Sequence, residues 1–288
     1  MINLLVTGNE ILLHAQKNKY AVGAFNANNM EIVHAIIEAA EELNSPVIIQ
    51  ASQGGLKYAG VEYISALGKV AAENAKVPVA IHLDHGTDFG QVMQCIRHGF
   101  SSVMIDASQY SLEENIERTK KVVEIAHAVG VSVEAELGKI GGTEDDVVVD
   151  HRDATFTDPE EARIFVEQTG VDSLAIAVGT AHGVYKGEPK IDYDRIKEIA
   201  SVVSIPLVLH GSSGVPYESL EKAVSCGIAK INIDTDIRAA FARKVNEFVR
   251  ENPEEIDPRK ILGPATLEMK ETIKEKMRVF GSDGKNWL

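Results

Sequence analysis

The chain has 288 residues, of which 44% are hydrophobic and 25% charged, a composition typical of a globular protein with a sizeable core. Its 29 Lys and Arg against 43 Asp and Glu give a formal net charge of −14. This charge argues against nucleic acid or a membrane as a partner, because both need a concentrated basic surface. No apolar run is long enough to cross a membrane, and charges interrupt the N-terminal segment where a signal peptide would be apolar, so we expect a cytoplasmic protein.

Eight short apolar runs of strand length follow one another along the chain. They cover residues 21–26, 46–52, 77–84, 101–107, 131–138, 173–179, 206–212 and 230–236. Amphipathic segments that fit helices separate them, and this alternation predicts an α/β fold with a parallel sheet. Eight such units in this length favour a single (β/α)8 TIM barrel over an open sheet, and no Gly-x-Gly-x-x-Gly follows the first run. We expect one catalytic domain over residues 1–288.

Capping signals predict where helices begin and end. The predicted starts are Asn28-x-x-Glu31, Ser111-x-x-Glu114 and Thr157-x-x-Glu160, and the predicted stops are Gly130, Gly170 and Gly227. A first helix over 9–18 should lie under the floor of the barrel. Extra C-terminal helices are expected over 236–250 and from Pro264 onward. Residues 138–158, which contain Gly141 and Gly142, are expected to form a long mobile loop at the mouth of the barrel.

Polar residues gather where the predicted strands end, which is where a barrel of this kind carries its chemistry. They are Asn26, Gln50, Ser52, His82, Asp84, His85, Asp106, Glu134, Glu136, His182, His210, Asn232, Asp234 and Thr235. His85, His182 and His210 come from three different strands and converge on one rim. Three imidazoles that leave a fourth position open are typical of a catalytic zinc site.

A turn of small residues, Gly211-Ser212-Ser213-Gly214, and the ending Asn232 to Thr235 stand side by side after the seventh and eighth strands. This corner of a barrel often holds a phosphate on backbone N–H groups and hydroxyls, and Lys186 adds positive charge nearby. The pattern indicates metal-assisted chemistry on a phosphorylated carbonyl compound, in which zinc stabilises an enediolate and a carboxylate moves the proton. It leaves cleavage of a carbon–carbon bond and isomerisation both open.

Five motifs resemble the class II, zinc-dependent ketose-bisphosphate aldolases, a family that includes the fructose-1,6-bisphosphate and tagatose-1,6-bisphosphate enzymes. They are Leu83-Asp84-His85-Gly86, Val133 to Gly138 followed by Gly141-Gly142-x-Glu144-Asp145, Thr180 to Gly187, Leu209 to Gly214, and Lys230 to Asp236. The likeness runs in order along nearly the whole chain. The motifs look more like those of the fructose enzymes.

The resemblance implies a role for each matching residue. His85, His182 and His210 match the zinc ligands, and Asp106 and Glu136 match acids that hold the metal in a second position. Asp84 matches the residue that exchanges a proton with the C4 hydroxyl, Glu144 the acid that handles the dihydroxyacetone-phosphate proton, and Asn232 the residue that contacts the enediolate.

The remaining matches concern binding of the phosphorylated sugar. The substrate-binding set is Asn26, Ser52, Gly183, Lys186, Gly211, Ser212, Ser213, Asn232, Ile233, Asp234, Thr235 and Arg259. The carbonyls of Gly183 and Gly211 would also help to hold a monovalent cation, and Arg259 would bind the distal phosphate, in its own or a neighbouring subunit. A homodimer or homotetramer is expected.

Other functions fit the sequence less well. A Schiff-base aldolase needs a lysine on an inner strand face, and Lys230 begins the eighth strand at the end of the barrel away from the site. A metal-dependent hydrolase would show an early His-x-His, whereas His82 and His85 have a different spacing. A non-catalytic sugar-phosphate sensor would not need Asp84 and Glu144, and tagatose 1,6-bisphosphate remains an alternative substrate.

Overall fold

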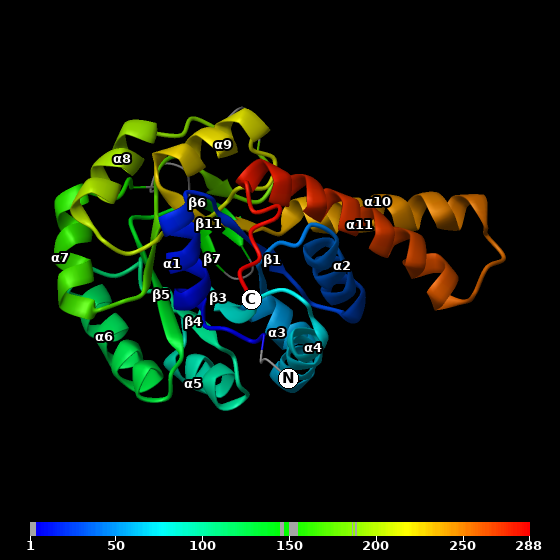
Figure 1. The fold of residues 1–288 in the computed structure, drawn as a ribbon, viewed down its shortest axis with the longest axis horizontal. Coiled ribbons are helices and arrows are strands. Elements are labelled where there is room, and N and C mark those ends of the chain that lie inside the picture. The colour runs from blue at the N-terminus through cyan, green and yellow to red at the C-terminus, as the bar shows by residue number, and fades with distance from the viewer. Residues whose placement is uncertain (1–3, 145–146, 150–154, 186, 188) are drawn as a thin grey trace.

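The computed structural model describes residues 4–144, 147–149, 155–185, 187 and 189–288. Eight parallel strands close into a barrel in the order β1-β11-β10-β8-β5-β4-β3-β2 (Figure 1). Their bounds are β1 Val22–Asn26, β2 Val47–Ser52, β3 Val79–Asp84, β4 Ser102–Ile105, β5 Ser132–Leu137, β8 Ser173–Ile176, β10 Leu207–Leu209 and β11 Ile228–Ile233. Each lies within or overlaps one of the eight predicted runs, so the predicted barrel is confirmed.

Helices surround the barrel and connect its strands (Figure 1). Their bounds are α1 Gly8–Asn18, α2 Met30–Glu42, α3 Gln53–Ala59, α4 Val61–Asn74, α5 Phe89–Arg97, α6 Leu112–Ala128, α7 Pro159–Thr169, α8 Tyr193–Val202, α9 Tyr217–Cys226, α10 Thr235–Glu251 and α11 Pro258–Phe280. As predicted, α1 closes the floor, where Ile11, Leu12 and Ala15 pack in a small core with Ala80 of β3 and Ala229 of β11. No helix in the described part of the chain is long and apolar enough to cross a membrane.

The strands bury both faces, which explains their nearly continuous apolar runs. In β5, Val133, Ala135 and Leu137 point outward into the core under the helices. Because side chains alternate along a strand, Glu134 and Glu136 both point into the barrel, where they are 1% and 3% exposed. The inner face of the barrel therefore carries charged and polar groups.

The expected loop over 138–158 contains regular structure instead. β6 Gly141–Glu144 and β7 Val147–Val149 form an antiparallel hairpin, and β6 also pairs in parallel with β9 Ala181–His182. The prediction missed this sheet because Gly141 and Gly142 resemble a loop when considered alone, and the pairing of β6 with β9 joins residues far apart in sequence. The loop was predicted to be mobile, and its residues 145, 146 and 150–154 lie outside the described part of the chain.

Two helix starts differ from the prediction. The side chain of Asn29, not Asn28, caps α2, and that of Asp158, not Thr157, caps α7, whereas Ser111 caps α6 as predicted. The second C-terminal helix begins at Pro258, where Asp257 accepts a hydrogen bond from the backbone of Arg259, and Pro264 lies inside it. Packing of α11 against α10 and α2 offsets the hydrogen bond that Pro264 cannot make.

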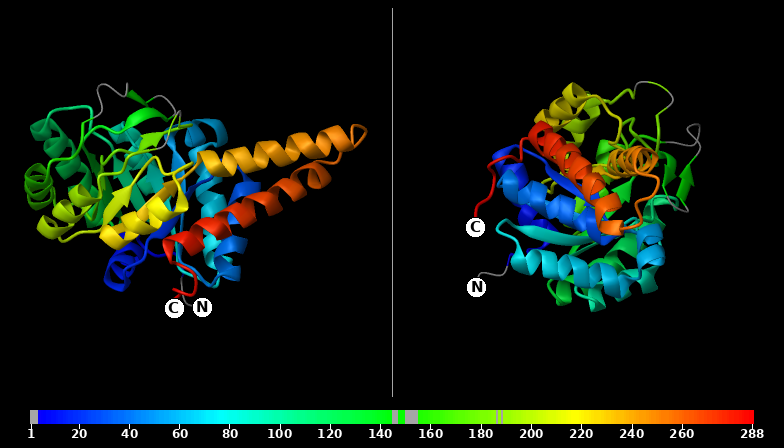
Figure 2. Two further views of the ribbon diagram at one scale, coloured as in Figure 1. Left: turned by 90° about the horizontal axis from the view of Figure 1, so that it is seen from above. Right: turned by 90° about the vertical axis from the view of Figure 1, so that its right-hand side faces the viewer.

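The helices α10 and α11 form a hairpin that projects well beyond the barrel (Figure 2). They contain 17 and 23 residues, so they are about 25 and 35 Å long at 1.5 Å per residue. The turn between them lies at the far end of this projection (Figures 1 and 2).

Candidate active site

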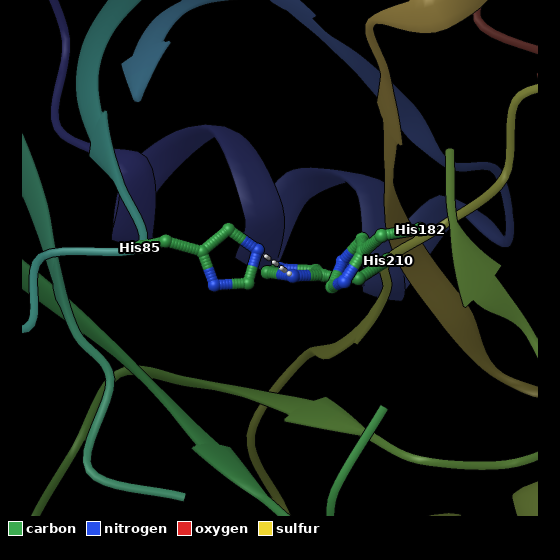
Figure 3. Close-up of side chains that lie close together, drawn as sticks. All are labelled: His85, His182 and His210. Carbon is green, nitrogen blue, oxygen red and sulfur yellow. Dashed lines mark hydrogen bonds between the residues drawn. The ribbon is translucent and has the colours of Figure 1, made fainter. Parts of the chain in front are cut away.

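Three histidines meet at the mouth of the barrel, each at the end of a different strand. His85 follows β3, His182 ends β9 and His210 follows β10. One ring nitrogen of each lies within 4.8 Å of those of the other two, and all three point toward one another (Figure 3). Nε2 of His85 lies 3.0 Å from Nδ1 of His210. The predicted convergence of the three imidazoles is therefore present.

The neighbouring residues Asp84 and His85 both serve this mouth, although adjacent side chains in a strand point to opposite faces. The conformation of His85 accounts for this, because β3 ends at Asp84 and His85 has a φ of 47°, in the left-handed region. This backbone turn brings the imidazole over the barrel while Asp84 still points into it. A non-glycine residue in this region costs roughly 1 kcal/mol or more, so the surrounding packing must stabilise the turn.

In His85 and His210, one ring nitrogen faces the other histidine and is called the inner nitrogen here. The other one, the outer nitrogen, contacts a carboxylate. Nδ1 of His85 lies 2.8 Å from Oδ2 of Asp106, and Nε2 of His210 lies 3.0 Å from Oε1 of Glu134. Ionised carboxylates only accept hydrogen bonds, so both outer nitrogens are the N–H donors. Burial lowers the pKa of His210, which keeps its ring neutral. When both rings are neutral, the two inner nitrogens, which lie 3.0 Å apart, carry the lone pairs that a metal needs.

This arrangement fits a bound cation. Two lone pairs at that distance repel unless a positive charge lies between or beside them. Two nitrogens bound to one tetrahedral zinc would stand about 3.3 Å apart, from Zn–N bonds of about 2.0–2.1 Å. The donor set and its spacing in this structure therefore suit zinc.

A second group of possible ligands shares one histidine with the first. His85, Asp106 and Glu136 also bring their donor atoms within 4.8 Å of one another. Burial alone would raise the pKa of Asp106, but hydrogen bonds from His85 and Ser108 outweigh it and lower the pKa to about 2. Oε2 of Glu136 lies 3.5 Å from Nδ1 of His210, so this carboxylate also adjoins the first group.

Asp84 lies fully buried beside the histidines and is held by three side-chain amides. Its Oδ2 accepts hydrogen bonds from Asn26 at 3.0 Å and from Gln50 at 3.2 Å, and its Oδ1 accepts one from Asn232 at 3.1 Å. Oδ1 of Asn232 is buried without a hydrogen-bond partner among the described residues. The amides orient the carboxylate, and Oδ1 of Asn232 remains able to accept a further hydrogen bond.

A pocket of about 210 Å³ opens beside this group. It is lined by Asn26, His182, Gly183, Val184, Gly211, Ser212, Ser213, Asn232, Asp234, Thr235 and Arg238. Oγ of Ser213 accepts hydrogen bonds from the backbone N–H groups of Asp234 and Asp236 at the start of α10. Gly211 has a φ of 60°, and a Cβ there would lie 2.5 Å from the carbonyl oxygen of Ala181, so only glycine fits.

Not every predicted site residue reaches this pocket. The side chain of Ile233 packs in the outer core, and Ser52 caps α3 through a hydrogen bond from Gly55. Arg259 lies at the far end of the α10–α11 hairpin, 89% exposed and paired with Asp257. Lys186 and the side chain of Glu144 lie outside the described residues.

Several residues that the predicted site set leaves out take part in this geometry. Gln50 holds Asp84, and Arg238 lines the pocket and pairs with Asp234. Tyr185 donates to the carbonyl of Gly211 at 2.7 Å and accepts from the backbone of Ala181 at 2.7 Å, so it links two segments of the mouth. Gln50 carried a signal, its position at a strand end, whereas the contacts of Arg238 and Tyr185 depend on the folded loops.

Comparison with known proteins identifies this arrangement. A sequence profile described as "Fructose-bisphosphate aldolase class-II" matches residues 6–285. The chain belongs to this family. The predicted relationship is confirmed, and the protein is therefore an aldolase, a carbon–carbon lyase of a metal-dependent family that acts on phosphorylated sugars.

Individual relatives span the whole chain. A fructose-bisphosphate aldolase of Thermus caldophilus is 52% identical over 98% of this chain and 100% of its own length. A sulfofructosephosphate aldolase of Alkalicoccus urumqiensis is 46% identical over 97% of this chain and 98% of its own length. The crystal structure of the YdjI aldolase from Escherichia coli K12 superposes with a TM-score of 0.86 at 36% identity, covering 98% of this chain and 100% of that one.

Proposed function

We propose that this aldolase reversibly cleaves fructose 1,6-bisphosphate into dihydroxyacetone phosphate and glyceraldehyde 3-phosphate. The observation that carries the proposal is the meeting of three imidazole nitrogens within 4.8 Å beside the buried carboxylate of Asp84 and a polar pocket. The 52% identical relative from Thermus caldophilus, named for this substrate, supports it. The reaction would belong to glycolysis or gluconeogenesis in the cytoplasm.

The metal is proposed to be zinc, held by His85, His182 and His210. Zinc supplies Lewis-acid stabilisation of the negative charge that develops on the substrate's carbonyl oxygen. Asp106 and Glu136, together with His85, would offer it a second position.

Asp84 is proposed to accept the proton of the C4 hydroxyl when the bond between C3 and C4 breaks. Its buried carboxylate is suited to this because the three amides fix its position without neutralising it. Glu144 would then transfer a different proton, the one that is exchanged on dihydroxyacetone phosphate. Asn232, whose Oδ1 is free among the described residues, would contact the reacting carbon chain.

The pocket is proposed to bind the dihydroxyacetone-phosphate end of the substrate through Gly183, Gly211, Ser212, Ser213, Asp234, Thr235 and the backbone of Ile233. Ser213 already accepts two backbone hydrogen bonds, so its hydroxyl proton is free to donate to a phosphate oxygen. The start of α10 adds the positive end of a helix dipole. Carbonyls of Gly183 and Gly211 would hold a monovalent cation beside the same phosphate.

The other end of the substrate is proposed to contact Asn26, Ser52 and Lys186, with Arg259 on the distal phosphate. Arg259 lies at the tip of a hairpin that projects away from its own barrel (Figure 2). Its contact therefore requires a second copy of the chain, which is the basis for proposing a homodimer or homotetramer.

Steady-state cleavage by zinc-loaded protein tests the substrate. The two epimers differ only at C4, and a misplaced hydrogen bond to Asp84 is worth roughly 1–3 kcal/mol, or about one to two decades in kcat/KM. We expect fructose 1,6-bisphosphate to be cleaved better than tagatose 1,6-bisphosphate by this factor. A higher kcat/KM for the tagatose epimer would overturn the substrate assignment and leave the aldolase family intact.

A further inference from the structure

A chain of buried charged and polar side chains lies inside the barrel directly below the three histidines. Nζ of Lys230 lies 2.8 Å from Oε2 and 3.0 Å from Oε1 of Glu134, and 3.5 Å from Nε2 of His82. Nδ1 of His82 lies 2.8 Å from the hydroxyl of Ser102. Glu134 in turn contacts His210. None of these side chains lines the pocket that would hold the substrate.

Stability alone does not explain this pair of charges. Lys230 and Glu134 are each 1% exposed, and a buried ion pair is often no more stabilising than apolar residues of the same volume. β11 begins at Ile228, so Lys230 does not begin this strand as predicted, and its side chain reaches Glu134 inside the barrel. Its ammonium is occupied by Glu134 and His82, so it is not a free amine nucleophile.

The position of Glu134 determines which nitrogen of His210 faces the other histidines. Its carboxylate oxygen lies 3.0 Å from Nε2 of His210, so it accepts the ring proton there. The opposite nitrogen, Nδ1, then carries a lone pair and points at His85. If the proton sat on Nδ1 instead, this nitrogen could not bind a metal.

We propose that Glu134, anchored by Lys230, is a positioning residue that fixes the proton of His210 on Nε2 and presents Nδ1 to the metal. The proposal rests on the function proposed above for the histidine cluster. Lys230 anchors the carboxylate from below through both of its oxygens. Carboxylates that hold the ring of a metal-binding histidine typically change metal affinity 10- to 100-fold when they are removed.

The most direct test uses the wild-type protein without metal. Nitrogen-15 NMR of its histidine rings reports which nitrogen carries the proton, and the His210 signals are assigned by their absence from a His210→Ala variant. We expect the proton on Nε2 before zinc is added. A proton on Nδ1 would overturn the proposal, whatever the activity of the enzyme.

Two double variants separate the carboxylate from the charge pair. Lys230→Met with Glu134→Met removes both charges and the acceptor, whereas Lys230→Met with Glu134→Gln removes both charges but keeps an amide oxygen near His210. We expect the first to bind zinc about 10- to 100-fold more weakly than wild type in competition with a chelator, and the second to lose less. The visible absorption of the cobalt-loaded proteins should change in the same order.

Asp172→Asn is a matched control, because Asp172 makes a hydrogen bond of the same kind, at 2.8 Å, to the exposed His127. Its zinc affinity should equal that of wild type. Equal zinc affinities and cobalt spectra for the two double variants would refute the role of Glu134. Failure of wild-type protein to bind zinc at all would instead refute the proposed function, and the NMR result distinguishes the two.

Discussion

Replacing Asp84 by Asn should separate catalysis from stability. In the wild type, Oδ2 accepts two hydrogen bonds and Oδ1 accepts one, from Asn232. In the Asp84→Asn variant, an amide oxygen in the place of Oδ2 still accepts the hydrogen bonds from Asn26 and Gln50. The new NH₂ group would face the amide of Asn232. Oδ1 of Asn232 has no hydrogen-bond partner among the described residues, and it would accept from this NH₂ group after the Asn232 amide rotates by 180°.

The number of hydrogen bonds is then unchanged, so the cost is limited. Bonds to a charged group are roughly 1 kcal/mol stronger than neutral ones, but the burial cost of the charge is also removed. We expect Asp84→Asn to change the free energy of unfolding by about 1–2 kcal/mol. Asp84→Ala leaves the amide donors of Asn26 and Asn232 without this acceptor, which costs about 2–6 kcal/mol at roughly 1–3 kcal/mol for each donor.

Both variants lose the carboxylate that is proposed to accept the proton of the C4 hydroxyl. Loss of a general base lowers turnover about 10²- to 10⁴-fold, which is about 3–5 kcal/mol of transition-state stabilisation. Exchange of the dihydroxyacetone-phosphate proton should remain measurable in Asp84→Asn, because Glu144 is the residue proposed to transfer that proton.

Urea unfolding, a coupled cleavage assay and deuterium exchange into dihydroxyacetone phosphate measure the three effects. Asp84→Asn cleaving within tenfold of the wild-type rate would refute the catalytic role. Asp84→Ala as stable as Asp84→Asn would refute the account of the amides.

Three further predictions follow from other parts of the molecule. Glu144→Ala should suppress proton exchange on dihydroxyacetone phosphate with zinc still bound, and unchanged exchange by NMR would contradict its proposed role. Gly211→Ala should raise KM for fructose 1,6-bisphosphate more than tenfold because of the clash with a backbone carbonyl, whereas Gly130→Ala, with a φ of 74° and open space around its Cβ, should lose only about 1–2 kcal/mol of stability and keep its KM. Equal KM values would contradict this. Hydrogen bonds from Lys270 and Lys274 of α11 lower the pKa of Glu42 to about 2. The ionised carboxylate therefore adds less than about 1 kcal/mol to the free energy of unfolding, and this stabilisation is present above pH 4.5 and lost as the pH falls toward 2. Glu42→Gln should therefore reduce the loss of stability over this range in acid unfolding, and an unchanged loss would argue against the contact.

The eight barrel strands could be predicted because each is a buried run whose signal is local. The mouth could be predicted for the same reason, since a residue at the end of a parallel strand lies at the mouth whatever its long-range contacts. His85 and His210, which directly follow β3 and β10, came from this rule, whereas His182 ends β9 of the small sheet, six residues after β8 ends. The left-handed φ of His85, which brings it beside Asp84, has no local signal, because histidine does not require that conformation.

Features that depend on contacts between distant segments were missed. The β6–β7 hairpin pairs with β9, about 40 residues further along the chain, and its residues resemble a loop when considered alone. The ion pair of Lys230 and Glu134 depends on the relative positions of β11 and β5 along the barrel axis. The sequence predicts a helix start at Pro264, because a proline inside a helix is unfavourable, whereas in the structure Pro264 lies inside α11.

Removing the metal and adding it back tests whether cleavage depends on zinc at the three histidines. The protein is dialysed against a strong chelator until metal analysis finds no zinc, and cleavage of fructose 1,6-bisphosphate is then measured before and after zinc is added back. We predict no cleavage in the metal-free protein, full recovery with about one zinc per chain, and neither zinc nor activity in His210→Ala, because two imidazoles do not hold the site. Full cleavage by metal-free protein would contradict the account.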